Sequence, residues 1–163
     1  MAIKKILFVC TGNTCRSPLA SAILKDKADF VEVRSAGIHA ALNMPASDGT
    51  KAVLKERNLS TDHASQPLSK ELLRWADLVL TMTAAHKQSI IAMFPDEKHD
   101  HVYTLKEFVD PDAKEIDIAD PFGGSIDVYR QTADEIEKYI DEVIRKIEEK
   151  GMEGRRRERN LIV

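Results

Sequence analysis

Cysteine is scarce in this chain, and so are aromatic residues and long apolar runs. Only 2 of the 163 residues are cysteine, and 6% are aromatic. Two cysteines cannot form the disulfide framework that stabilises small secreted domains. No apolar run approaches the ~20 residues that a membrane-spanning helix requires, and no leader with a cleavage pattern precedes the first strand-like segment. We therefore expect a cytoplasmic protein whose thiols are reduced.

Charge of one sign is not in excess either. The chain holds 27 acidic residues against 24 Lys and Arg, which gives a formal net charge of −3. This balance provides no overall attraction to nucleic acid or to an anionic membrane, and we expect neither as a partner. The five histidines are scattered, and with two cysteines they do not supply the ligands of a structural zinc site. No metal and no organic cofactor are expected.

Apolar segments typical of strands alternate with helical patterns, and the length fits one domain. We expect strands over residues 3–9, 30–37, 77–82 and 101–105. One helix is expected to start at residues 17–18 and another to include residues 53–54, and three more are expected over residues 69–76, 83–94 and 127–149. Such alternation is typical of a parallel sheet with helices on both faces. We predict an α/β fold with a doubly wound, four-stranded parallel sheet in residues 1–150. Residues 109–125 are expected to form a polar loop and residues 151–163 a basic, disordered tail.

Both cysteines lie with an arginine in the stretch "CTGNTCRS", residues 10–17, which directly follows the first predicted strand. In a doubly wound sheet this turn is a usual anion site, because backbone N–H groups and the positive end of a helix dipole converge there. Gly12 permits positive φ and Asn13 tolerates it, so the chain can fold into such a nest. Ser17 before a proline is expected to be the N-cap of the helix. The residues expected to line the site are Thr11, Gly12, Asn13, Thr14, Cys15, Arg16 and Ser17.

Cys10 ends the strand beneath these donors. The donors that bind an oxyanion also stabilise a thiolate, so we expect Cys10 to be ionised at neutral pH. A thiolate that faces a bound phosphate can attack phosphorus and form a phosphocysteine, and Arg16 can pair its planar fork with two phosphate oxygens. A nucleotide P-loop is excluded because G-x-x-x-x-G-K-[ST] is absent, and a thioredoxin motif because four residues separate Cys10 from Cys15. A buried cysteine beside an ordinary anion-binding turn is the non-catalytic alternative.

The motif C-x5-R-S near the N-terminus and "DPFGGS" at 120–125 occur in the order typical of low-molecular-weight protein tyrosine phosphatases, and the chain resembles this family. The segments "RSAG" at 34–37 and "ADLVLTM" at 76–82 are also similar to family segments, so the resemblance extends to about Gly151. It implies the family's fold and phosphorylated proteins as substrates. By position it assigns the nucleophile to Cys10, phosphate binding to Arg16 and the loop amides, support of the loop to Asn13, and donation to the thiolate to Ser17.

Asp120, directly before Pro121, has the position of the family's general acid. A phosphoryl transfer needs a proton for the leaving group, and a carboxylic acid in a loop can deliver it and then act as a base toward water. Asp-Pro also starts ordinary turns, and Asp110–Pro111 repeats the dipeptide. The run "FGGS" after Pro121 favours Asp120. An anion-binding or redox-sensing module without enzymatic activity, which is an alternative, would tolerate the loss of Asp120.

The residues around the pocket differ from those typical of tyrosine-specific members. Those members carry two consecutive aromatics after Asp-Pro, whereas here Phe122 is followed by Gly123, so one wall of the slot for a phenol is missing. Thr14 stands where tyrosine-directed relatives tend to have a bulkier aliphatic residue. In both respects the chain is most similar to the protein-arginine phosphatase branch. This resemblance implies phosphoarginine in proteins as substrate and an opposing protein arginine kinase, with phosphotyrosine as the alternative substrate.

Cys15 and the histidines leave further alternatives open. Cys15 is either a small hydrophobe under the loop or a resolving thiol that forms a disulfide with oxidised Cys10. Arsenate reductases share the loop but need more cysteines than this chain has to relay a disulfide. His63 lies where family members often have a histidine that supports the site, and Trp75 is expected to pack its helix. Nothing in the sequence demands more than a monomer.

Overall fold

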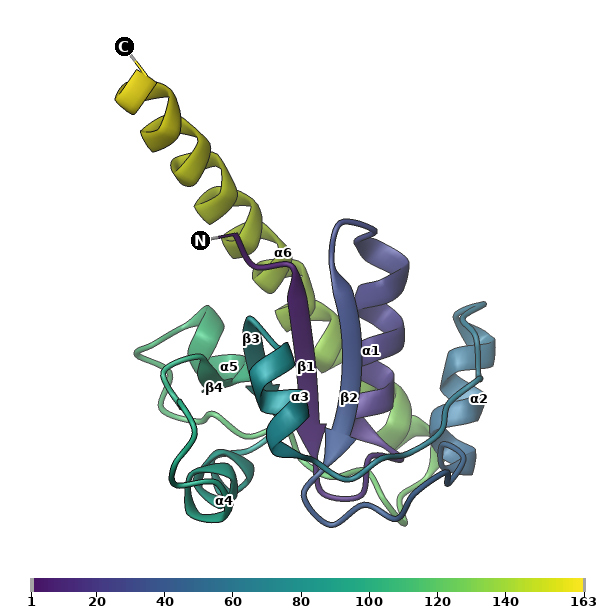
Figure 1. Cartoon of the computed structure of the whole chain (residues 1–163). Helices are drawn as coiled ribbons and strands as arrows, with labels where there is room; N and C mark the ends of the chain where they lie inside the picture. The colour runs from purple at the N-terminus through teal and green to yellow at the C-terminus, as the bar shows by residue number, and fades with distance from the viewer. Residues whose placement is uncertain (1, 163) are drawn as a thin grey trace.

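Four parallel strands form the centre of the molecule, in the order β2-β1-β3-β4 (Figure 1). The structure is a computed structural model and describes residues 2–162. The strands are β1 (Lys5–Cys10), β2 (Glu32–Gly37), β3 (Leu78–Thr81) and β4 (Val102–Thr104). Each pairing is parallel, so the carboxyl ends of all four strands meet at one edge of the sheet. The predicted α/β class and the parallel four-stranded sheet are confirmed.

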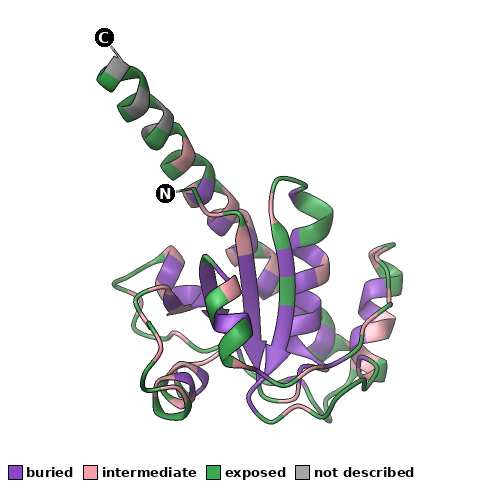
Figure 2. Cartoon of the chain, in the orientation of Figure 1, coloured by how far each residue is buried: buried purple, intermediate pink, exposed green. Residues whose placement is uncertain are grey.

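Helices cover both faces of this sheet, because successive side chains of β1 point to opposite sides. Ile6 and Phe8 pack in the larger core cluster with α1 (Arg16–Lys27) and α6 (Ile126–Ile162). Leu7 and Val9 pack in a second cluster with α3 (Lys70–Trp75) and α4 (Ala84–Met93). Figure 2 shows that β1 is buried along almost its whole length. Cys10 therefore ends a rigid central strand. The two other helices of the described chain are α2 (Asp48–Glu56) and α5 (Leu105–Val109).

Two helices differ from the sequence expectation. The short helix α5 was not expected, because five residues are too few for a clear periodicity; its signal is the capping box between Thr104 and Glu107. The helix α6 continues through Ile162 instead of ending near residue 149. Each of the two glycines in this extension costs only about 1 kcal/mol of helix stability, and no proline interrupts it. The structure thus has a helix where the sequence predicted a disordered tail.

The extension of α6 projects away from the rest of the molecule (Figure 1). The described side chains from residue 154 onward are exposed. That residues 1–150 form the functional domain stays a prediction. Within residues 2–162, no helix combines the length and the apolar character that crossing a membrane requires.

Candidate active site

The loop between β1 and α1 is held from outside by the segment that follows β2. The carbonyl oxygens of Cys10, Thr11 and Thr14 each accept a hydrogen bond of 2.9 Å from a backbone N–H group of residues 38–47. In the described part of the chain, the backbone N–H groups of the loop itself donate to no other residue. Carbonyls that point outward and N–H groups without protein partners form a concave set of donors, which is the geometry of an anion-binding nest.

Asn13 clamps the centre of this loop. It adopts the left-handed conformation with φ of 57°, which asparagine tolerates better than most residues. Its side-chain amide donates to the hydroxyl oxygens of Ser17 (2.8 Å) and Ser35 (2.9 Å), and its side-chain oxygen accepts from the backbone N–H of Gln66 (3.0 Å). The backbone oxygen of Asn13 lies 2.6 Å from Nε2 of His63. Four contacts on one residue thus fix the curvature of the loop.

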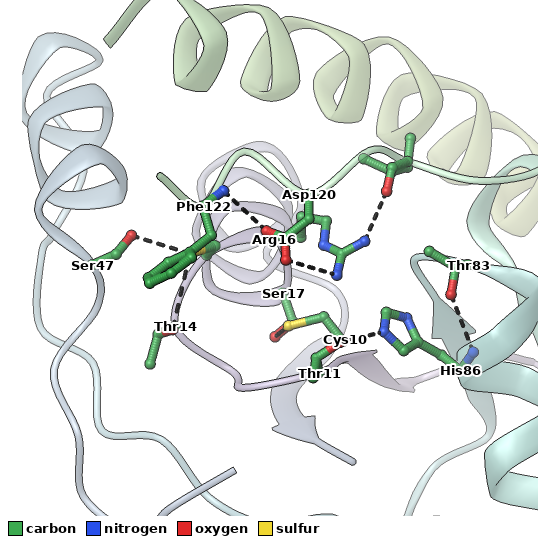
Figure 3. A network of polar contacts seen from close by, with 12 residues as sticks. Cys10, Thr11, Thr14, Arg16, Ser17, Ser47, Thr83, His86, Asp120 and Phe122 are labelled. Carbon is green, nitrogen blue, oxygen red and sulfur yellow. Dashed lines mark hydrogen bonds and ion pairs between the residues drawn. The ribbon is translucent and has the colours of Figure 1, made fainter. Parts of the chain in front are cut away.

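Cys10 is buried, and its sulfur lies 2.9 Å from the hydroxyl of Ser17 (Figure 3). Because the Ser17 oxygen accepts from Asn13, its own proton is free to point at the sulfur. A hydroxyl that donates to sulfur favours the thiolate over the thiol. The prediction that Ser17 is the N-cap is wrong: Cys15 is the N-cap residue, it has no side-chain capping bond, and the helix begins at Arg16. The Ser17 hydroxyl faces the nucleophile instead.

Arg16 is almost fully buried at the start of α1, with 5% of its surface exposed. Its Nη1 donates to the backbone oxygen of Ile118 (2.8 Å), and its Nη2 lies 3.6 Å from Oδ2 of Asp120. Its Nε is a buried donor with no hydrogen-bond partner among the described residues. Buried donors are nearly always satisfied, so a free one beside a nest of N–H groups fits an oxyanion supplied by a substrate.

Asp120 lies at the open side of the same site. Its side chain is half exposed and in contact with Arg16, and its Oδ1 accepts the backbone N–H of Phe122 at 3.1 Å. This turn leaves Oδ2 directed toward the guanidinium of Arg16 (Figure 3). Asp110, the other aspartate before a proline, is the C-cap residue of α5, and its Oδ1 accepts the backbone N–H of Asp112 (3.0 Å). The geometry therefore favours Asp120 as the acid of the site.

Thr14, Cys15 and Phe122 form the flank of the loop. Oγ1 of Thr14 lies 3.9 Å from Sγ of Cys15 and 3.6 Å from the position of a Cβ on Gly12, so the Thr14 hydroxyl lies against the loop itself. Cys15 is buried, its thiol donates to the Ser47 hydroxyl at 3.3 Å, and it lies 3.7 Å from the hydroxyl of Tyr129. The side chain of Phe122, in contrast, is 75% exposed. One exposed aromatic ring therefore stands beside the loop, whose Cys15 is buried.

Tyr129 and His86 belong to the site but were not found by the sequence analysis. Burial, together with the neighbouring Cys15 thiol, raises the pKa of Tyr129 above its ordinary value, so its hydroxyl stays protonated. His86 Nε2 lies 2.8 Å from Oγ1 of Thr11, although the two residues are 75 positions apart in the sequence. No local sequence signal links them, since β3 and α4 reach the loop only because β3 pairs with β1. His63, to which the sequence analysis gave a supporting position, does contact the loop.

A buried thiol, a nest of backbone donors, a buried arginine and a nearby carboxylic acid together define a cysteine-dependent phosphatase site. The family model described as "Low molecular weight phosphotyrosine protein phosphatase" matches residues 5–153. The chain belongs to this family, and the family prediction is confirmed. Within the described residues, no group of three or more His, Cys, Asp or Glu side chains could hold a metal ion.

Several individual proteins are similar to this chain in sequence or in structure. It is 50% identical over 145 residues to a protein-arginine-phosphatase of Geobacillus stearothermophilus, which covers 88% of this chain and 96% of the relative. It is 40% identical over 132 residues to the low molecular weight protein-tyrosine-phosphatase PtpB of Staphylococcus haemolyticus, which covers 81% and 91%. A solved structure of a YwlE arginine phosphatase variant with a phosphorylated active-site serine has a TM-score of 0.84 and 44% identity, and covers 88% of this chain and 95% of that one.

Proposed function

We propose that this chain hydrolyses phosphoarginine in proteins through a phosphocysteine intermediate. The phosphate binds to the loop N–H groups and to Arg16, and the Cys10 thiolate attacks phosphorus. The P–N bond breaks as Asp120 gives its proton to the leaving guanidinium nitrogen. The Asp120 carboxylate then takes a proton from water, whose oxygen attacks phosphorus and releases inorganic phosphate and the thiolate. A relative with a phosphorylated active-site serine supports a phosphoenzyme.

The observation that carries the choice of phosphoarginine is the single aromatic wall of the pocket. Phe122 is followed by Gly123, which has φ of 80° and no atom within 4 Å of the position of a Cβ. A phenol ring is stabilised by stacking against aromatic faces on both of its sides, whereas a phosphoguanidinium is thin and polar. In this proposal the Thr14 side chain narrows the pocket further and helps to orient the attacking water. The identity to a relative named protein-arginine-phosphatase supports the same substrate.

The test is turnover of phosphoarginine and phosphotyrosine peptides side by side, with Cys10→Ser as the inactive control. We expect a strong preference for phosphoarginine, shifted toward phosphotyrosine by Thr14→Ile because the added apolar surface favours a ring. A parent that prefers phosphotyrosine would contradict the proposed substrate and leave the phosphatase chemistry intact.

Asp120→Asn tests the acid separately. We expect kcat to fall about 100-fold or more, since general acid–base catalysis contributes about 10²–10⁴-fold, with the inhibition constant of inorganic phosphate little changed. Unchanged turnover would remove the acid assignment and favour the anion-binding alternative.

Phosphotyrosine is the second candidate substrate, and the relative named PtpB is the observation that favours it. Arsenate reduction is less well supported, because this chain has only Cys15 in addition to the nucleophile to relay a disulfide. A cytoplasmic location, a monomeric state and an opposing protein arginine kinase are carried forward as parts of the same proposal. Sedimentation of the purified chain measures the monomeric state, which a stable dimer would contradict.

A further inference from the structure

The first turn of α4 brings a histidine to the phosphate loop. The backbone N–H of His86 donates to the hydroxyl of the N-cap residue Thr83 (3.1 Å), which fixes the start of the helix. From there the imidazole reaches Thr11, the residue directly after the nucleophile, and its Nε2 lies 2.8 Å from Oγ1 of Thr11 (Figure 3). The contact joins a rigid helix to a loop whose amides must stay aligned.

His86 is buried at this place, with 7% of its surface exposed. Its second ring nitrogen, Nδ1, has no hydrogen-bond partner among the described residues. The charged groups that face the ring are Arg16 from α1, and Asp117 and Asp120 from the segment before α6. Burial and the Arg16 charge lower the pKa of His86 to about 4, so the ring is neutral at neutral pH. A neutral ring adds no positive charge beside Arg16.

We propose that His86 is a positioning residue of the phosphate site: through Nε2 it fixes the Thr11 side chain and so holds the loop amides beside Cys10 in the orientation that binds phosphate. Thr11 has its backbone oxygen bonded to the segment after β2 and its side chain bonded to His86, so it is held from both sides. Loss of either contact gives the adjoining peptide freedom to rotate. Phosphate binding and the attack by Cys10 depend on the same peptide.

This inference rests on the proposed phosphate site, but not on the choice of phosphoarginine as substrate. The test therefore uses para-nitrophenyl phosphate as a generic substrate and the inhibition constant of inorganic phosphate as a measure of binding without chemistry. The single variants are His86→Ala, His86→Gln, His86→Asn and Thr11→Val. The double variant combines His86→Ala with Thr11→Val. Glutamine places its terminal amide near the position of Nε2, whereas asparagine reaches only that of Nδ1. The matched control is His99→Gln, because Nε2 of His99 makes a similar contact to the backbone oxygen of Phe94 (2.7 Å) beyond the other end of α4.

We expect the inhibition constant of phosphate to rise about tenfold in His86→Ala and His86→Asn, as for the loss of one hydrogen bond, with a parallel fall in kcat/KM. His86→Gln should stay within about threefold of the parent, and the double variant should be no worse than Thr11→Val alone. Thermal unfolding shows which variants fold. If His86→Ala does not fold, the comparison of His86→Gln with His86→Asn, together with Thr11→Val, still tests the positioning role.

Glutamine as weak as asparagine, or additive effects in the double variant, would overturn the role of the Thr11 contact. A parent that binds no phosphate would overturn the phosphate site itself. A parent that hydrolyses para-nitrophenyl phosphate but not phosphoarginine would overturn only the proposed substrate, and its His86 variants would still decide the positioning role.

Discussion

At the scale of single residues, the site depends on side chains that serve two partners at once. The Ser17 hydroxyl accepts from Asn13 and faces the Cys10 sulfur, and Arg16 binds both a backbone oxygen and Asp120. Because each of these side chains has two partners, the conformation of the loop is coupled to the charged groups of the site. A change at one residue is therefore felt by the nucleophile even where the two do not touch.

The buried neutral state of His86 makes the protein sensitive to acid. Its pKa is about 4 in the folded protein, below the ordinary value of 6.5. Between these values His86 binds a proton in the unfolded chain but not in the folded chain. The contribution of the neutral ring to the free energy of unfolding is therefore fully present above pH 6.5 and is lost as the pH falls toward 4. The loss at pH 5 is about 2 kcal/mol, given about 1.4 kcal/mol per pKa unit.

Urea unfolding at pH 7 and pH 5 measures this loss. The parent and His99→Gln should lose about 2 kcal/mol more than His86→Gln over this interval, because glutamine takes up no proton. Equal losses in the parent and in His86→Gln would show that His86 does not carry the acid sensitivity.

We predict that Cys15 protects the nucleophile from irreversible oxidation. Peroxide converts the Cys10 thiolate to a sulfenic acid, and attack by the Cys15 thiol on that sulfur forms a disulfide and releases water. We expect peroxide to abolish the activity of the parent and dithiothreitol to restore it. The Cys15→Ala variant should lose its activity irreversibly under the same treatment. The measurement is activity before and after reductant. Irreversible loss in both proteins would leave Cys15 as a small buried residue held by Ser47 and Tyr129.

At the scale of elements, the end of β2 limits the shape of the phosphate loop. A Cβ on Gly37 would lie 2.5 Å from the backbone oxygen of Thr11 and 2.9 Å from the backbone nitrogen of Asn13. These are backbone atoms of the loop, which cannot move without changing the anion site. Glycine is therefore required here by close approach between two segments and not by an unusual φ.

Gly37→Ala should lower kcat/KM at least about tenfold and destabilise the protein by about 1–3 kcal/mol, the usual cost of overpacking. Steady-state kinetics and urea unfolding test this expectation. Gly154→Ala in α6 is the matched control, because a Cβ there meets no atom within 4 Å; it should keep activity and gain up to about 1 kcal/mol. Parent-like kinetics in Gly37→Ala would mean that the loop does not need its present contact with β2.

The elements that could be predicted from sequence are those whose signals are local. The strand before Cys10, the turn "CTGNTCRS" and the short helix expected over residues 69–76 all carry their information within a few residues, and the structure has each of them. The Thr11–His86 contact was missed because its residues are far apart in sequence. The cap at Ser17 was wrong for a related reason: its hydroxyl is engaged by Asn13 and Cys10, and this tertiary contact outweighs the local capping preference.

At the scale of the whole molecule, the strand order decides which segments can meet at the site. The chain passes from β1 to β2 on one side and to β3 on the other, so the loop after β1 lies at the point where the order reverses. Ligands of such sheets bind at this point, beyond the carboxyl ends of the strands. The turn from β3 into α4 is a neighbour of the loop for the same reason, which explains why a histidine from α4 can reach Thr11.

The opposite end of the molecule carries the extension of α6, and this distance predicts that the extension is dispensable for catalysis. In Figure 1 the end of α6 projects past the amino end of β1, away from the edge that holds the site. A chain that ends after Met152 should keep kcat/KM within about twofold, and its Tm should stay within about 2 °C, since the described side chains removed are exposed. A chain that ends after Tyr139 is the contrasting control, because it also loses the buried Ile140, Val143 and Ile147 and should not fold. A clear loss of activity in the longer chain, with its Tm unchanged, would assign the projecting helix a role in catalysis that its position gives no reason to expect.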